Sequence, residues 1–556
     1  MKYWCSLWLI LFYSSCAYYT GNMRAKRFNR QSSLPSLVNQ SNPRQYVAPS
    51  SWTTHPILKD WAEKPLGDWK TKGKVHSIRV ILAKLALNQD IVEVNRYILD
   101  AKPWGKSGTD WAFNPNGDYD FTEILLCAVV FLFDNYPDRL YPITQKHIVN
   151  YLLTEEGNKP RLKTRGSLGI VKETENHLLM TEASRYLKHQ WLYQCSVFEE
   201  GSKVDNEQHN NLRNGMEQWL YDYLEEMEQI GLFEFNSVPY MGYTSVALLV
   251  LEAFADSERI STKARRILDL SNWQYALGSQ NFRHCPPFRR QLNKVSETSL
   301  NKDAHTSLMQ TWYHEYKGKT VDQTLVPFNN HQSLVALILP YQLPSELVAW
   351  IDSKKAPYFA RLGHGWHASP EIYHGSFVHL LSAGGVQRGK ASQIVPRPIT
   401  LLLADGRNVL DYTQSFHISG KANIGNWNNT GVHKNFAVGR QPVSIPEAYK
   451  AKATFKGWQV FEHKGSRSFK IAVYNSKNLG LLLLFPNYTK SADYLSKALD
   501  LANPDLKILH KQVIFPDSKT VISFDLKAQK NKWVIKSING KAVDRKYDNW
   551  PRITLE

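Results

Sequence analysis

The segment 173–191 combines a polar cluster with a helix-forming run, and it contains residues whose types and spacing could do chemistry. The cluster reads Glu-Thr-Glu-Asn-His over 173–177. Thr174 is a good N-cap, and Glu175 places an acid in the first turn, where the helix dipole favours it. Apolar residues repeat at helical spacing from Asn176 onward, so this amide should point inward at the mouth of the helix packing. We expect Asn176 and His177 to belong to a site.

Two more loops of the same kind precede apolar helices, at 116–121 and 234–244. If the three helices run parallel, their entering loops gather at one mouth, and convergent polar groups at a concave mouth are typical of an active site. The alternative is that each loop only caps its own helix. The loops and the chain just before them add these candidates for substrate contact or acid–base chemistry: Trp111, Asp120, Asn236, Tyr240 and Tyr243.

The elements that must position these residues change character along the chain. From about 75 to about 350 the pattern is helical, and helices that are apolar nearly all round alternate with amphipathic ones, which indicates a two-layer ring of helical hairpins. Beyond about 390, short strands separated by turn residues indicate an antiparallel β-sandwich. We predict an α+β multidomain protein with an (α/α) toroid at 51–385 and a β-sandwich at 386–556. The candidate helices are 76–100, 120–134, 144–154, 175–196, 206–230, 243–257, 260–277 and 303–316.

The N-terminus and the net charge narrow the choice of partner. Residues 1–16 are typical of a signal peptide or a lipoprotein leader with Cys16 as the lipidated residue, and the basic stretch 17–50 is typical of a disordered spacer. With 68 Lys and Arg against 50 Asp and Glu, the chain has a net charge of +18, which favours a polyanion. An exported protein is a poor candidate for nucleic acid. We expect a secreted, cell-surface or periplasmic monomer that acts on an acidic polysaccharide.

A helical toroid followed by a β-sandwich in an exported, basic protein resembles the polysaccharide lyases of the chondroitin AC lyase and heparinase II/III type. The resemblance is architectural and covers residues 60–556. It implies cleavage by β-elimination, in which a donor neutralises the uronate carboxylate while other groups move protons. On this chain it implies that Asn176 polarises the carboxylate, that His177 is a base or a second donor, and that Tyr240 or Tyr243 is the general acid or base.

The same resemblance gives expectations for residues further along the chain. Arg289 and Arg290 would hold anionic groups of the substrate bidentately. His374 or His367 would close the site from the segment that joins the two domains. Each of these has a simpler explanation, because a tyrosine before an apolar helix often only packs and a pair of arginines often only meets solvent.

Three alternatives stay open on the sequence alone. A glycoside hydrolase on the same toroid would need two carboxylates across the scissile bond. A non-catalytic glycan-binding protein would need aromatic residues and arginines but no acid–base pair. No cofactor is expected, although the spacing of His364 and His367 would also suit a structural divalent metal. The carboxylates available to a hydrolase are Asp118, Asp120, Glu173, Glu175 and Glu234.

Overall fold

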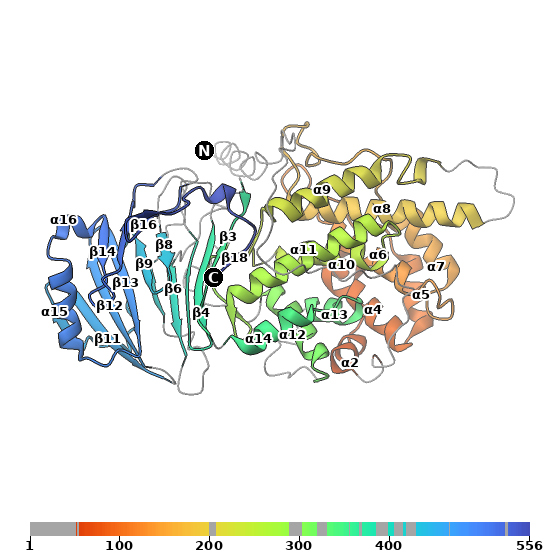
Figure 1. Cartoon of the computed structure of the whole chain (residues 1–556). Coiled ribbons are helices and arrows are strands. Elements are labelled where there is room, and N and C mark those ends of the chain that lie inside the picture. The colour runs from red at the N-terminus through yellow and green to blue at the C-terminus, as the bar shows by residue number, and fades with distance from the viewer. Residues whose placement is uncertain are drawn as a thin grey trace, which may run out of the picture.

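The computed structural model describes residues 52, 55–198, 207–238, 240–288, 303–319, 331–354, 356–365, 370–384, 399–404, 415–418, 430–465, 468–528 and 532–556. It has an α+β fold, with helices mostly in the N-terminal part and antiparallel sheets in the C-terminal part. Figure 1 shows the helices on one side of the molecule and the sheets on the other. Several expectations lie outside the described residues, namely those for 1–16 with Cys16, for 17–50, and for Arg289, Arg290 and His367.

The helical part confirms most of the expected helices, and the bounds follow. They are α2 (Pro56–Ala62), α3 (Trp69–Lys72), α4 (Ile78–Leu87), α5 (Ile91–Asp100), α6 (Asp120–Leu132), α7 (Pro142–His147), α8 (Glu175–Phe198), α9 (Met216–Ile230), α10 (Met241–Phe254), α11 (Glu258–Leu277), α12 (Ala304–Tyr316), α13 (His331–Ile338) and α14 (Ser345–Ser353).

Two of the expected helices differ from the structure. The helix expected over 76–100 is divided into α4 and α5, because Asn88 and Asp90 both have a left-handed backbone, with φ of 56° and 51°. The amide of Asn88 closes the end of α4 by bonding to the Leu85 carbonyl. Short polar side chains tolerate this conformation, so an Asn–Gln–Asp sequence breaks the periodicity without a glycine. The helix expected from 206 begins only at Met216, after Gly215 in the left-handed region.

The helices α6, α8 and α10 pack against one another in the middle of the helical part. Nearly every side chain of α6 and most of those of α10 are buried, as expected for helices that are apolar on all faces. α9, which has a clear polar side, packs on α8 and α11 from outside. α12 approaches α10 closely, because a Cβ added at Gly242 would lie 2.4 Å from the Ala304 Cβ. No helix among the described residues is long and apolar enough to cross a membrane.

The C-terminal part forms antiparallel sheets. One has the order β18-β3-β4-β5-β6-β7, a second β10-β11-β12-β13-β9-β8, and a third β14-β15-β16-β17, and a two-stranded β1-β2 ribbon follows α11. The strands are β1 (Ser279–Gln280), β2 (Arg283–His284), β3 (Tyr358–Leu362), β4 (Glu371–Ser376), β5 (His379–Ala383), β6 (Ile399–Leu403), β7 (Phe416–Ile418), β8 (Thr430–His433), β9 (Phe436–Gly439), β10 (Ala453–Phe455), β11 (Trp458–Lys464), β12 (Ser468–Ser476), β13 (Leu479–Pro486), β14 (Gln512–Ile514), β15 (Val521–Phe524), β16 (Ile535–Ile538), β17 (Lys541–Ala542) and β18 (Thr554–Leu555). The helices α15 (Ala492–Ala502) and α16 (Leu506–Leu509) lie among them, and α15 packs on β10 and β11.

The first large sheet starts earlier in the chain than the sequence pattern indicated. β3, β4 and β5 lie before residue 385, yet they are hydrogen-bonded to β6 and β7 in one sheet. These strands are buried on both faces, so they lack the alternation of polar and apolar residues that marks a half-exposed strand. Figure 1 shows β3, β4 and β18 on the side of the sheets nearest the helices.

Candidate functional site

The first turns of α6, α8 and α10 lie together at one end of the helical part. The imidazole Nδ1 of His177, at the start of α8, lies 2.8 Å from Oδ2 of Asp120, the first residue of α6. The ring of Phe121 makes edge contacts with His177 at 5.3 Å and with Tyr243 at 4.3 Å between centroids. The three loops that enter these helices therefore gather as the sequence predicted.

His177 is held as a cation between two carboxylates. Its Nε2 lies 3.4 Å from Oδ1 of Asp118, and Asp118 is in turn paired with Lys74. Burial by itself would lower the pKa of His177, but the neighbouring carboxylates, Asp120 first, raise this pKa to about 9. An imidazolium has no lone pair to accept a proton. At neutral pH the geometry therefore suits His177 as a positive charge or a donor, and not as a base.

Asn176 carries a buried side-chain amide at the start of α8. Its side chain is fully buried, and its Oδ1 accepts a hydrogen bond of 2.9 Å from the Thr174 hydroxyl. Its Nδ2 has no hydrogen-bond partner in the described part of the chain. Leaving such a donor unpaired costs about 1–3 kcal/mol, and buried groups of this kind are uncommon in folded proteins. A ligand oxygen would satisfy the amide.

Tyr243, which also contacts Phe121, lies near a buried arginine. Its ring stacks on that of His331 at 5.8 Å and 23°. Arg79 donates from Nε to the His331 carbonyl at 2.9 Å and from Nη1 to the Val75 carbonyl. Burial lowers the pKa of Arg79 to about 10, and negative charge on Tyr243 acts against this shift. The Arg79 guanidinium therefore lies within electrostatic range of the Tyr243 side chain.

His331 is neutral at physiological pH. Burial, and secondarily the charge of Arg79, lower its pKa to about 3. Its Nε2 is buried and has no partner among the residues that the structure describes. It therefore offers a polar edge next to Tyr243 without competing for a proton.

Glu175 links the start of α8 to the chain that leads into α10. Its carboxyl group accepts hydrogen bonds from the backbone amides of Phe233 at 2.8 Å and Glu234 at 3.4 Å. Burial, with further contributions from Glu234 and Glu226, raises the pKa of Glu175 to about 8 despite these bonds. Glu175 is therefore mostly protonated at neutral pH, and it positions the loop before α10.

The loop 104–119 lies against the same helix ends. Its Asp118 accepts a hydrogen bond of 3.1 Å from the Asp110 amide, and Asp110 is itself exposed. Burial, followed by the charge of Asp118, raises the pKa of Asp110. The expected sugar-stacking residue Trp111 is half-buried and donates from its indole nitrogen to the Arg165 carbonyl at 2.9 Å. Its ring contacts Phe113.

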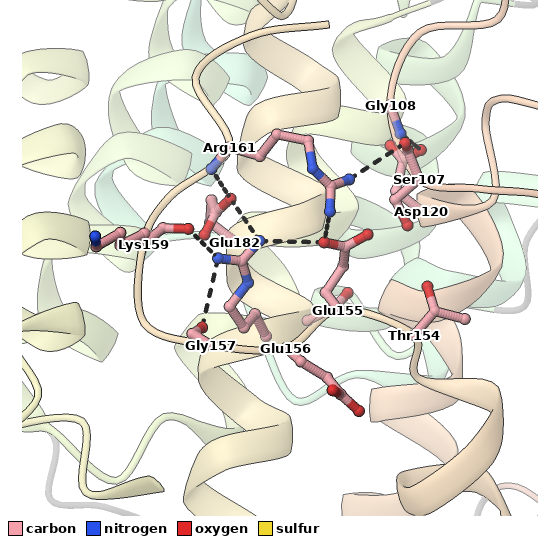
Figure 2. A network of polar contacts seen from close by, with 12 residues as sticks. Ser107, Gly108, Asp120, Thr154, Glu155, Glu156, Gly157, Lys159, Arg161 and Glu182 are labelled. Carbon is pink, nitrogen blue, oxygen red and sulfur yellow. Dashed lines mark hydrogen bonds and ion pairs between the residues drawn. The ribbon is translucent and has the colours of Figure 1, made fainter. Parts of the chain in front are cut away.

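A network of charges beside the site fixes this loop to α8 (Figure 2). Glu155 is ion-paired with Arg161, with Arg165 at 2.8 Å and with Arg185 of α8 at 3.1 Å. Arg165 also donates to the Ser107 carbonyl at 3.2 Å. Breaking one partner of a buried ion pair typically costs about 3–5 kcal/mol, so this network resists displacement of the loop.

Most of the carboxylates that a hydrolase could use make bonds inside the protein. Asp120 is fully buried, and besides His177 it accepts the Gly108 amide at 3.0 Å. Glu173 is 4% exposed and accepts hydrogen bonds from the Thr109 amide and hydroxyl. Among the described acids near the helix ends, Asp110 and the partly exposed Asp118 are the pair best placed to meet a ligand.

The remaining candidates lie in different surroundings. Tyr240 is half-buried just before α10, and its carbonyl accepts the amides of Tyr243 and Thr244 at 3.0 Å. Asn236 donates its amide hydrogens to Glu371 at 2.6 Å and to the Pro287 carbonyl at 3.2 Å, so its donor is already used. His374 contacts the Tyr358 carbonyl at 2.8 Å and Asn435 at 3.1 Å, both in the sheet region.

The alternation of β4 explains why His374 does not join the site. Glu371 and Tyr373 point toward Asn236 of the helical part. Successive side chains of a strand point to opposite faces, so His374 points into the sheets. The geometry places Glu371 and Tyr373, and not His374, at the junction with the helices.

Sequence reasoning missed Lys74, Arg79 and His331. Lys74 lies just before α4, and Arg79 lies within it. A short helical segment, and not a polar loop, leads directly into α4. His331 begins the short apolar helix α13. A buried arginine in an otherwise apolar run, as in Ile78-Arg-Val-Ile-Leu, is the one sequence signal that could have marked Arg79, because arginine is almost never buried without a partner.

Neither metal-binding geometry nor a known relative defines the site further. Within the described ranges, no group of three or more His, Cys, Asp or Glu side chains is arranged to hold a metal ion. His364 is bonded to Glu371 at 2.6 Å. Comparisons with protein-family models, with curated proteins and with solved structures gave no match to this chain.

Proposed function

We propose that this protein is an exported, monomeric enzyme that cleaves a uronate-containing polysaccharide by β-elimination, with a helical toroid and a β-sandwich as its two domains. The observation that carries the proposal is the buried amide of Asn176, whose Nδ2 has no partner among the described residues, together with the imidazolium of His177 at the next position of the helix. An amide donor and a fixed positive charge are what a carboxylate needs for its charge to be neutralised. The net charge of +18 supports an acidic polymer as the partner.

In the proposed reaction, Asn176 and His177 neutralise the carboxylate of the uronate, which makes the proton on the adjacent carbon more acidic. Tyr243, as its phenolate next to Arg79, takes this proton. The electron pair forms a double bond to the neighbouring ring carbon, and the bond from that carbon to the glycosidic oxygen breaks with its electrons. The Tyr243 hydroxyl then gives this same proton to the leaving oxygen, so the tyrosine returns to its starting phenolate form without exchanging a proton with solvent.

A panel of uronate-containing polymers tests this proposal. The full-length protein should generate the absorbance of an unsaturated uronate, together with new reducing ends. Tyr243→Phe should lower kcat by about 10²–10⁴, the usual contribution of a general acid or base. The matched control is Tyr221→Phe on α9, whose hydroxyl is hydrogen-bonded to Glu225 and whose ring lies against Arg259 and Lys263, and which should keep its activity.

Other outcomes would replace the proposal. Reducing ends without the unsaturated product would identify hydrolysis, and Asp110 and Asp118 would then be the acids to substitute. Binding of the polymer without any product would identify a glycan-binding protein. In that case Tyr243→Phe would leave the affinity unchanged.

A further inference from the structure

The loop between α9 and α10, described at residues 231–238 and 240, meets the sheet side at three points along its length. At its start, a Cβ added at Gly231 would lie 1.4 Å from Nη1 of Arg552 near the C-terminus. In its middle, the ring of Phe235 stacks on that of His364 at 3.5 Å and 8°. Next to it, Asn236 donates to Oε2 of Glu371 at 2.6 Å.

Glu371, the first residue of β4, is the centre of these contacts. It is fully buried, and it receives hydrogen bonds from Asn236, from the Tyr373 hydroxyl at 2.5 Å and from His364 Nε2 at 2.6 Å. Burial alone would raise the pKa of Glu371, but these donors, His364 first, hold it below its ordinary value. Glu371 therefore stays ionised, and its hydrogen bonds are of the stronger, charge-assisted kind.

The backbone at Asn236 depends on this contact. Its φ is 52°, in the left-handed region, which costs free energy for a residue other than glycine unless the surroundings hold it. The same amide also donates to the Pro287 carbonyl and reaches the Tyr373 hydroxyl at 3.4 Å. Movement of Asn236 would pass into α10, because the Met241 amide is bonded to the Ser237 carbonyl at 3.1 Å.

We infer that Glu371 is a positioning residue for the acid–base tyrosine. Although it belongs to a sheet, it fixes the loop 231–240 through Asn236 and thereby sets the start of α10, where Tyr240 and Tyr243 lie. The sheets are thus part of the catalytic apparatus without touching the reacting atoms. This inference rests on the proposed function for its catalytic consequence, but the fixing of the loop is independent of it.

The test is Glu371→Gln in the full-length chain, which keeps the size of the side chain and removes its charge. Amide hydrogen exchange in residues 231–243 should become roughly tenfold faster, with little change elsewhere. On a uronate polymer, kcat should fall by about 10–100-fold with KM within about twofold, since a small misplacement of a catalytic group slows the chemical step. Glu371→Asp should recover part of the lost kcat because the charge is kept.

The control is Asp269→Asn on α11, which changes another buried carboxyl group that accepts from a tyrosine, Tyr341, at 2.6 Å, but has no hydrogen bond to the described residues of the loop. Equal effects of both substitutions on exchange in 231–243 would overturn the inference, as would unchanged exchange and kcat in Glu371→Gln. If the wild-type protein forms no unsaturated product but Glu371→Gln still loosens the loop, the proposed function fails and the positioning role of Glu371 stands.

Discussion

At the scale of single residues, two different causes favour protonation around the helix ends, neighbouring negative charge at His177 and burial at Glu175. His177 gains a proton because two aspartates face its ring nitrogens. Glu175 gains one because it is buried near other acids, with only amide donors to oppose the effect. At neutral pH the site therefore contains a histidine cation and a neutral glutamic acid, which the sequence alone does not reveal.

The raised pKa of Glu175 predicts how stability depends on pH. Its pKa rises from 4.5 when unfolded to about 8 when folded, so the native state binds more protons between these values. Stability from this group is present below pH 4.5 and is lost as pH rises toward 8. Glu175→Gln mimics the protonated form. The free energy of unfolding of Glu175→Gln minus that of the wild type should therefore be larger at pH 8 than at pH 5, by on the order of 3 kcal/mol.

Urea denaturation at the two pH values measures this difference. Glu93→Gln on α5 is the control, because Glu93 is exposed and its replacement should give a difference that hardly changes with pH. A constant offset between wild type and Glu175→Gln across the range would mean that Glu175 is ionised in the native protein.

At the scale of elements, the site depends on how closely the helix ends approach one another. Gly242 lies in the first turn of α10, where a Cβ would be 2.4 Å from the Ala304 Cβ of α12 and 2.8 Å from Nε2 of Gln332 in α13. Glycine is normally a poor helix residue. Here it lets three helices converge at the turn that carries Tyr243.

Gly242→Ala should therefore destabilise the protein by about 1–3 kcal/mol, although alanine is the better helix former, because the added methyl group has no space. Ala304→Gly removes the nearest atom, so the double variant should recover part of the loss. Thermal or urea unfolding of the wild type, both single variants and the double variant measures this coupling. Strictly additive effects would show that the two positions do not press on each other.

At the scale of the whole molecule, the helical part and the sheets share buried polar contacts. The Tyr358 hydroxyl of β3 donates to the Leu277 carbonyl at the end of α11 at 2.6 Å, and Lys354, between α14 and β3, donates to the carbonyls of Ala276 in α11 and, at 2.6 Å, of Ser279 in β1. With the bond between Asn236 and Glu371, these contacts tie α11 and the loop before α10 to β3 and β4. Separating the two parts would leave buried donors and acceptors unpaired, which is costly.

We therefore expect the two parts to unfold together. The helical circular dichroism signal and tryptophan fluorescence should report the same denaturation midpoint. Tyr358→Phe should lower both signals' midpoints equally, since it removes one bond between the parts. Two separated transitions in the wild-type protein would contradict this picture.

The sequence by itself determined the α+β class, the approximate extent of α6, α8, α10 and α12, and the gathering of polar loops at the starts of α6, α8 and α10. Local patterns suffice for this, because a continuous apolar face and a polar cap are properties of neighbouring residues. The sequence also placed Asn176 and His177 correctly at the start of a buried helix.

Only the tertiary structure decided which groups meet there. Arg79 and His331 reach Tyr243 from distant helices, and Glu371 reaches the loop before α10 from a strand that is buried on both faces and has no readable alternation. The tertiary structure also decided the protonation state of His177, because its pKa depends on Asp118 and Asp120, which are far from it in sequence. Contacts between residues far apart in the chain leave no periodic signal, so they become visible only when the chain is folded.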